Sequence, residues 1–351
     1  MKRAVLRTLL TALAIQPLRV FGVAAQEHTI IALSHDDFTV YALDPVLGEI
    51  VGRYRAQDQP HEGVSSPDGK TLYIAVPLGE PHVVILDGET LEEKGRIESE
   101  YFHRPPQEIR LGGEARMNTS SLPHGVALNR DGSKLYVGVE WAEVPGLVVY
   151  DVGEGRVVGK IDLLLEGGHF FAVDPRTDKL YYPHRDDDRV VVIDTATDRI
   201  LKIIPVQGGP VGVDFSIAGE AWIHSDGDGS VTVIDTRTDE VVEVIRTEGT
   251  GAGRMAVSPD GRWAASTHGG TRDVAIIDTR TRDVVATIPL GRGPGFPLFS
   301  PASGKLYVMN SGEADIAVID LGSMAVEARY PVGENPFGGM IRYVGGRAAS
   351  R

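Results

Sequence analysis

Residues 294–330, PGFPLFSPASGKLYVMNSGEADIAVIDLGSMAVEARY, decide the fold of this chain. Four short runs rich in β-branched and other apolar residues lie at 294–300, 305–309, 315–320 and 324–330, with turn residues between them. Alternating runs bounded by Gly, Pro, Ser and Asp predict β-strands joined by tight turns. The stretch is therefore expected to form one four-stranded antiparallel unit.

The same unit recurs along the chain, each time marked by an apolar run that ends in aspartate. The seven markers are Asp44, Asp87, Asp151, Asp194, Asp235, Asp278 and Asp320. They are separated by 43, 64, 43, 41, 43 and 42 residues. A period in the low forties with four strands per unit is typical of a β-propeller. The fold class predicted is an all-β, seven-bladed propeller.

The two ends of the chain are expected to share one blade. Residues 28–58 precede the second unit but lack an innermost strand, whereas residues 335–345 resemble an innermost strand alone. Pairing the C-terminal strand with the N-terminal blade would close the ring and remove exposed strand edges. Residues 26–351 are thus predicted to form a single propeller.

Residues 1–25 have the pattern of a secretory signal peptide. A basic start with Lys2, Arg3 and Arg7 precedes an apolar run at 9–15 and small residues at 23–25. This order favours export and a periplasmic or secreted protein. The apolar run is too short to span a bilayer, and no later segment reaches the roughly 18 apolar residues required, so no transmembrane segment is expected.

Charge and cysteine content exclude several classes of function. The chain has a formal charge of −14, and removal of the four basic leader residues would make it −18. Sequence-independent nucleic-acid binding depends on basic residues, so a nucleic-acid partner is not expected. With zero cysteines the chain can form no disulfide, thiolate metal site or cysteine nucleophile.

The repeated units resemble those of the YVTN-repeat, or YncE-like, family of periplasmic β-propellers. The similarity lies in TLYIAVP at 71–77, KLYVGVE at 134–140, VVVIDTATDRI at 190–200 and KLYVMNS at 305–311. It implies the propeller fold and export. It does not select an activity, because that family includes surface-layer and binding proteins and relatives of lactonases and of haem- or quinone-linked enzymes.

Three histidines occupy one position in consecutive blades, at the start of the innermost strand: His61, His124 and His169. Imidazoles that converge could bind copper, iron or zinc, since neutral imidazole is the commonest protein metal ligand. The alternative is that each ring only hydrogen-bonds neighbouring backbone. Glu62 and Glu140 lie beside this set and are the candidate catalytic bases, unless they are ordinary carboxylates on the rim.

Further candidate ligand-binding residues are expected on the same face. They are His35, His184, His224, His268 and Asn310 near the ends of second strands, and His103, Arg104, Arg110 and Arg116 in an insertion. The insertion at 99–120 explains the interval of 64 residues and is predicted to act as a lid, because long loops in compact domains commonly do so.

Three functions remain open from the sequence. The first is an exported propeller that binds a small molecule or a periplasmic partner protein at its histidine-lined channel face, under the insertion. The second is a histidine-ligated copper or iron oxidoreductase built on His61, His124 and His169. The third is a lactonase-like hydrolase, which would require a carboxylate-rich calcium site that the sequence does not assemble.

Overall fold

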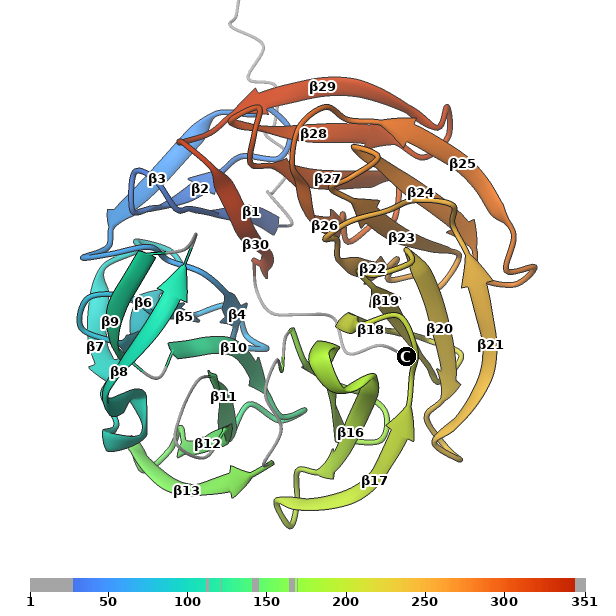
Figure 1. The fold of residues 1–351 in the computed structure, drawn as a ribbon. Coiled ribbons are helices and arrows are strands. Elements are labelled where there is room, and N and C mark those ends of the chain that lie inside the picture. The colour runs from blue at the N-terminus through green and yellow to red at the C-terminus, as the bar shows by residue number, and fades with distance from the viewer. Residues whose placement is uncertain are drawn as a thin grey trace, which may run out of the picture.

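The computed structural model describes residues 28–111, 114–120, 122–140, 145–163, 168 and 170–344. The proposed leader and His169 lie outside these residues. Seven four-stranded antiparallel sheets stand around a central axis, as Figure 1 shows. The seven-bladed fold predicted from the repeat is confirmed. No helix among the described residues has the length and apolar character that crossing a membrane requires.

Each blade runs from an innermost strand at the axis to an outermost strand at the rim. Blade 1 consists of β30 (Pro336–Tyr343), β1 (His28–Ser34), β2 (Thr39–Leu43) and β3 (Ile50–Arg55). Blade 2 consists of β4 (Gly63–Ser65), β5 (Thr71–Val76), β6 (His82–Asp87) and β7 (Glu93–Ile97). Blade 3 consists of β10 (Leu122–Leu128), β11 (Lys134–Glu140), β12 (Gly146–Asp151) and β13 (Arg156–Asp162). Blade 1 alone of these three combines the first described strands with the last one.

The remaining four blades repeat this order without interruption. They are β14 (Ala172–Val173), β15 (Lys179–His184), β16 (Arg189–Asp194), β17 (Arg199–Pro205); β18 (Pro210–Ser216), β19 (Glu220–Ser225), β20 (Ser230–Asp235), β21 (Glu240–Arg246); β22 (Met255–Val257), β23 (Trp263–His268), β24 (Asp273–Asp278), β25 (Val284–Pro289); β26 (Pro294–Phe299), β27 (Lys305–Asn310), β28 (Asp315–Asp320), β29 (Ala325–Pro331). A short 3-10 helix, η2 (Arg185–Asp187), follows β15.

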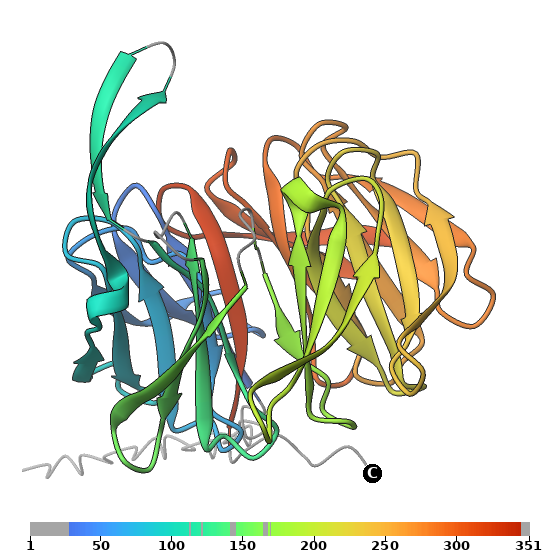
Figure 2. The same cartoon turned by 60° about the horizontal axis from the view of Figure 1, so that its bottom comes forward.

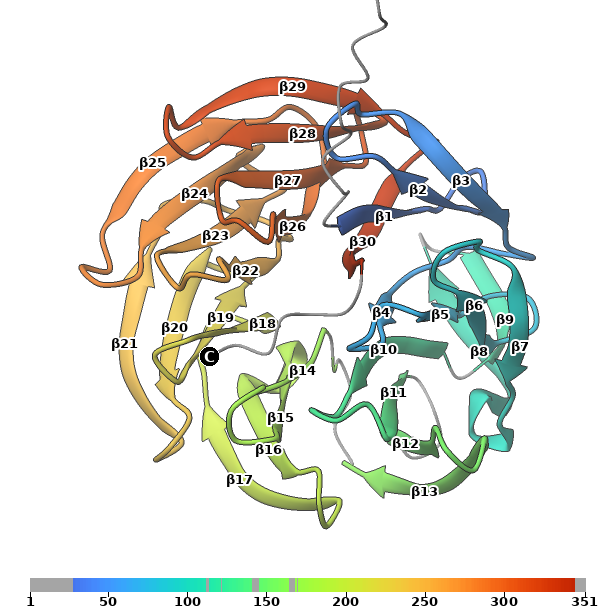
Figure 3. The ribbon, with the colours of Figure 1, turned by 180° about the vertical axis from the view of Figure 1, so that it is seen from behind.

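The ring closes where the chain ends meet. Strand β30 pairs antiparallel with β1 from His28 opposite Tyr343 to Ser34 opposite Pro336. Figures 1 and 3 show the two strands together from opposite sides of the ring. The predicted closure is confirmed, because β30 supplies the innermost strand that blade 1 otherwise lacks.

Seven hydrophobic clusters hold the blades together, one between each neighbouring pair. Their members alternate along the second and third strands, because each sheet packs both faces against a neighbour. Trp222, fully buried between blades 5 and 6, is the largest such side chain. Replacing a buried tryptophan with alanine typically costs about 3–5 kcal/mol.

The repeated Asp–Thr turns brace the outer hairpins, as side-chain acceptors in such turns do. In blade 6, Asp278 Oδ1 accepts the backbone N–H groups of Arg280 at 2.9 Å and Thr281 at 3.0 Å. Asp194 does the same for Ala196 at 2.9 Å. The recurring aspartates are therefore structural and do not belong to a site.

The Lys-Leu-Tyr motifs connect one blade to the next. Tyr136 donates to Asp198 Oδ1 at 2.6 Å, and Lys134 Nζ lies 2.8 Å from Asp198 Oδ2. Lys179 and Tyr181 of blade 4 hold Asp239 of blade 5 in the same way. Motifs that carry the family resemblance thus stabilise the ring.

The insertion forms an arm of two strands. After η1 (Glu100–Phe102), β8 (His103–Leu111) pairs with β9 (Glu114–Ser120), and β10 follows β9. Phe102 is buried between blades 2 and 3 and fixes the base of the arm. Figure 2 shows the arm rising away from the body. Whether it closes over a ligand remains a prediction.

Candidate functional site

The site lies where the innermost strands begin, on the face that also carries the arm. In four blades the hydrogen-bonded ladder skips one or two residues here, and the skipped residues include His124, Val211, Phe296 and Phe337. Such bulges redirect side chains out of the regular alternation of a strand. Residues just before or within the first three positions of the inner strands therefore supply most of the groups around the axis.

Three imidazoles from consecutive blades stack at this mouth. The ring centroids of His35 and His61 are 4.9 Å apart, and those of His61 and His124 are 4.2 Å apart. Phe337 of the closing strand packs 4.5 Å from His35 and 4.8 Å from His61. The structure brings His61 and His124 together, while His35 supplies the third ring of the stack.

Two buried carboxylates point at one ring nitrogen of this stack. Glu62 Oε1 lies 3.0 Å from His124 Nδ1, and Glu140 Oε1 lies 3.4 Å from the same nitrogen. Glu62 Oε1 is also 3.8 Å from His61 Nδ1. Glu62 is 6% exposed and Glu140 is 5% exposed. Both carboxylates are buried, and whether they act as catalytic bases or are ordinary carboxylates of the rim stays a prediction.

The carboxylates fix the protonation of the imidazoles. Burial lowers the pKa of His124, but Glu140 and Glu62 outweigh it, so that the pKa is raised. Burial would raise the pKa of Glu62, yet His124 outweighs it and lowers that pKa. Burial, followed by the repulsion of His124, lowers the pKa of His61 to about 4. The neighbouring carboxylates thus favour the protonated form of His124, whereas burial favours the neutral form of His61.

The opposite side of the mouth is an arginine held by aromatic rings. The guanidinium carbon of Arg254 lies 3.2 Å from the centroid of Phe170, 5.6 Å from that of Phe296 and 5.7 Å from that of Phe337. Arg254 Nη1 donates to the carbonyl of Gly253 at 2.6 Å. Burial lowers the pKa of Arg254 to about 10, although Asp226 and Glu62 oppose this shift.

We call this set the mouth cluster: His35, His61, Glu62, His124, Glu140, Phe170, Arg254, Phe296 and Phe337. Sequence reasoning missed Arg254, Phe170 and Phe296 as site residues. A signal for them existed, because they occupy the residue after the histidine position in blades 6, 4 and 7. Reading that position across all blades would have found them.

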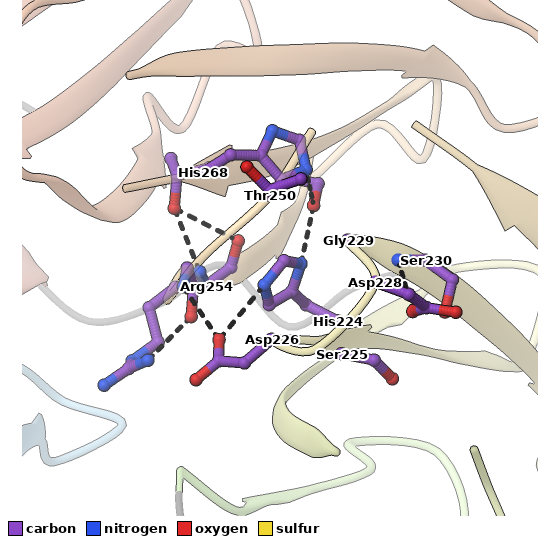
Figure 4. Close-up of polar contacts among 12 residues, drawn as sticks. His224, Ser225, Asp226, Asp228, Gly229, Ser230, Thr250, Arg254 and His268 are labelled. Atoms are coloured by element: carbon purple, nitrogen blue, oxygen red, sulfur yellow. Dashed lines mark hydrogen bonds and ion pairs between the residues drawn. The ribbon is translucent and has the colours of Figure 1, made fainter. Parts of the chain in front are cut away.

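A second histidine group lies apart from this cluster, at the ends of strands in blades 5 and 6. His268 Nδ1 is 2.9 Å from Asp273 Oδ1, and its Nε2 is 2.8 Å from Thr247 Oγ1. His224 Nδ1 is 2.8 Å from Ser266 Oγ, and its Nε2 is 3.3 Å from Asp226 Oδ1. We call His224 and His268 the interior pair. Figure 4 shows Arg254 extending away from both.

The other predicted site residues are dispersed. Asn310 donates to Asp315 Oδ1 at 2.9 Å, at the position that His268 holds in the previous blade. His184 packs 4.6 Å from Tyr182 at the end of β15. The structure places His103, Arg104 and Arg110 on β8 and Arg116 on β9. Their ligand-binding role stays a prediction.

Comparison with known proteins gives relatives but no function. No protein-family model matches the chain. The uncharacterized protein YncE of Escherichia coli O157:H7 is 26% identical over 177 residues, which are 46% of this chain and 44% of that protein. YncE of strain K12 is 25% identical over 176 residues, with the same coverage. The match thus spans less than half of these curated relatives.

Solved structures share the fold at low identity. A functionally unknown protein from Desulfotomaculum acetoxidans has a TM-score of 0.72 at 12% identity, covering 90% of this chain and 99% of that one. A Pseudomonas aeruginosa periplasmic gluconolactonase has a TM-score of 0.67 at 18% identity, also covering 90% and 99%. The YncE matches and the seven-bladed ring together support a YncE-like propeller family for this chain.

Proposed function

We propose that the protein is an exported propeller that binds a small-molecule ligand at the mouth cluster. The main support for this proposal is that aromatic walls and hydrogen-bonding groups from six blades meet at one end of the axis. Small-molecule sites combine such apolar walls with a few fixed polar groups. A shallow partner-protein contact would not need side chains this deeply buried.

Several donors of the cluster have no hydrogen-bond partner within the described part of the chain. These are His35 Nε2, His61 Nδ1 and Arg254 Nε. A buried polar atom without a partner costs about 1–3 kcal/mol. A ligand with acceptor oxygens would relieve that cost. This supports a ligand that has a flat apolar portion, for the phenylalanines, and a carboxylate, for Arg254.

Benzoate is a suitable first probe, since it has both features. Binding by the mature chain should be followed by ligand-observed NMR and calorimetry. Arg254→Met keeps an apolar stem over Phe170 but removes the guanidinium, and should weaken benzoate binding at least about tenfold. The matched control is Arg199→Met on the exposed strand β17. Equal binding by wild type and Arg254→Met would contradict the proposal.

Export is the second part of this proposal, and it rests on the pattern at residues 1–25. When the full chain is expressed in a Gram-negative host, the protein should be recovered from the periplasm with its leader removed near Ala25. N-terminal sequencing measures this directly. A full-length protein that stays in the cytoplasm would contradict it.

A lactonase-like activity receives less support. The gluconolactonase shares only the fold with this chain at 18% identity. Within the described residues, one group has the spacing of metal ligands, and it contains two imidazoles and one carboxylate. A calcium site calls for a set of oxygen ligands instead. A metal ion bound by this group would therefore be a transition metal and not calcium.

A further inference from the structure

We propose that His61, Glu62 and His124 form a binding site for a divalent transition-metal ion, with the buried carboxylate of Glu140 beside it. One ligand atom from each of His61, Glu62 and His124 lies within 4.8 Å of the others. The sequence suggested a set of histidines alone; here a carboxylate completes the set. This inference goes beyond ligand binding by the mouth cluster and does not depend on it.

The separations fit coordination of one ion. Ligand atoms bound at about 2.1 Å in tetrahedral or octahedral geometry lie about 3.0–3.4 Å from their neighbours. His124 Nδ1 lies 3.0 Å from Glu62 Oε1 and 3.4 Å from Glu140 Oε1. His61 Nδ1 is 3.8 Å from Glu62 Oε1, so a small rotation of either side chain brings this pair of atoms into the same range.

The backbone holds the ligands in place before any ion arrives. The backbone N–H of His61 donates to Ala75 O at 2.9 Å, and Ala75 N–H donates to Glu62 O at 2.8 Å. The dipeptide is therefore fixed on β5, while His124 and Glu140 lie on the paired strands β10 and β11. Ligand residues on rigid strands favour metal binding, because these side chains lose little conformational freedom when the ion binds.

The donor set indicates which ion would bind. Two imidazoles with one or two carboxylates and no thiolate suit Zn²⁺ or Fe²⁺ better than a soft copper(I) ion. Calcium and magnesium prefer oxygen ligands. A divalent ion bound here would also add positive charge near Arg254, whose charge already acts on Glu62. A metal-loaded mouth should therefore attract anions more strongly than the metal-free one.

The experiment is a titration of the chelator-treated mature protein with Zn²⁺ by calorimetry, and with Co²⁺ by visible absorption. We expect one equivalent of either ion to bind, and a Co²⁺ spectrum typical of nitrogen and oxygen ligands. Glu62→Gln and His124→Ala should each lower the Zn²⁺ affinity at least about 100-fold. The inference would be overturned if the wild type bound no Zn²⁺ at concentrations below about 0.1 mM. It would also be overturned if both variants bound Zn²⁺ as tightly as the wild type.

The controls use matched residues. His28 lies at the start of β1, the opposite end of the strand from His35, so His28→Ala should leave Zn²⁺ affinity unchanged. Glu92→Gln alters an exposed carboxylate outside the site. Should a site variant fail to fold, NMR of the wild type still decides, because Zn²⁺ must shift the ring protons of His61 and His124 and leave those of His28 in place.

Discussion

The mouth cluster and the interior pair are both made of buried histidines in the same repeat, yet they differ in how their ring nitrogens are used. Both nitrogens of His268 lie within 3 Å of Asp273 or Thr247. In contrast, His35 Nε2 and His61 Nδ1 have no hydrogen-bond partner among the described residues. The hydrogen bonds of His268 are complete without a ligand, whereas those of His35 and His61 are not.

The position of a histidine in a repeat therefore does not by itself reveal its function. Packing and hydrogen bonding explain both ring nitrogens of His268 and the Nδ1 of His224, as they do most buried polar groups. Aromatic walls and the buried guanidinium of Arg254 distinguish the mouth cluster. Stability should therefore depend on the interior pair, and binding should depend on the mouth cluster.

The strongest test of this contrast is His268→Ala. It leaves Asp273 and Thr247 without their buried partner, so the free energy of unfolding should fall by about 3 kcal/mol. Urea denaturation measures this. His268→Asn is the matched variant, because Asn310 makes the equivalent bond to Asp315 in blade 7, and it should recover part of the loss. If His268→Ala lowered the free energy of unfolding by less than about 1 kcal/mol, His268 would not have the structural role that this contrast assigns to it.

The next effect concerns pH. Burial, together with the repulsion of His268 and Arg254, lowers the pKa of His224 below 6.5 although Asp226 opposes the shift. The unfolded chain then binds a proton first as pH falls. His224 therefore contributes its full stabilisation above pH 6.5. Below pH 6.5 the free energy of unfolding falls by at most about 1.4 kcal/mol per pH unit, and this fall ends at the pKa of His224 in the folded protein.

His224→Gln should therefore reduce the fall in unfolding free energy between pH 6.5 and 5, as measured by urea titrations at each pH. His28→Gln is the control, because His28 is only partly buried at the start of β1. Identical slopes for wild type and His224→Gln would show that His224 is not held neutral by the fold.

A smaller stability effect is expected at the mouth. His61→Ala removes a ring that stacks on His35 and His124 but forms no hydrogen bond through Nδ1. The free energy of unfolding should change by about 1 kcal/mol or less. Thermal melts of the metal-free protein measure this. A loss as large as that of His268→Ala would place His61 among the structural residues.

The smallest effect is expected from Asn310→His, which gives blade 7 the residue that blade 6 has. Because Asp315 can accept from either side chain, stability should change by about 0.5 kcal/mol or less. The variant should also gain no affinity for Zn²⁺. A new metal site there would mean that histidine at this position is sufficient, contrary to the comparison.

The fold was predictable because its determinants are local and repeated. Strand runs, Asp–Thr turns and the incomplete first blade can all be read without long-range information. The site was only partly predictable. The register placed His61 and His124 together, but Arg254 and Phe170 stand one residue after that position and are found only when the next position is compared across all blades.

The arm shows a second limit. Residues 99–120 have charged residues and two consecutive prolines, which are typical of a loop. The structure pairs most of them as β8 and β9. Pairing between two strands depends on register across the hairpin, and a single sequence with few apolar residues specifies that register weakly.

The seam between β1 and β30 has a consequence for biosynthesis. His35 stacks on Phe337, which leaves the ribosome 302 residues later. During translation the first blade lacks its inner strand and the mouth lacks one wall. A small molecule that needs the Phe337 wall can therefore bind only after the chain is complete, and for an exported protein this would take place after translocation, from whatever the destination compartment supplies.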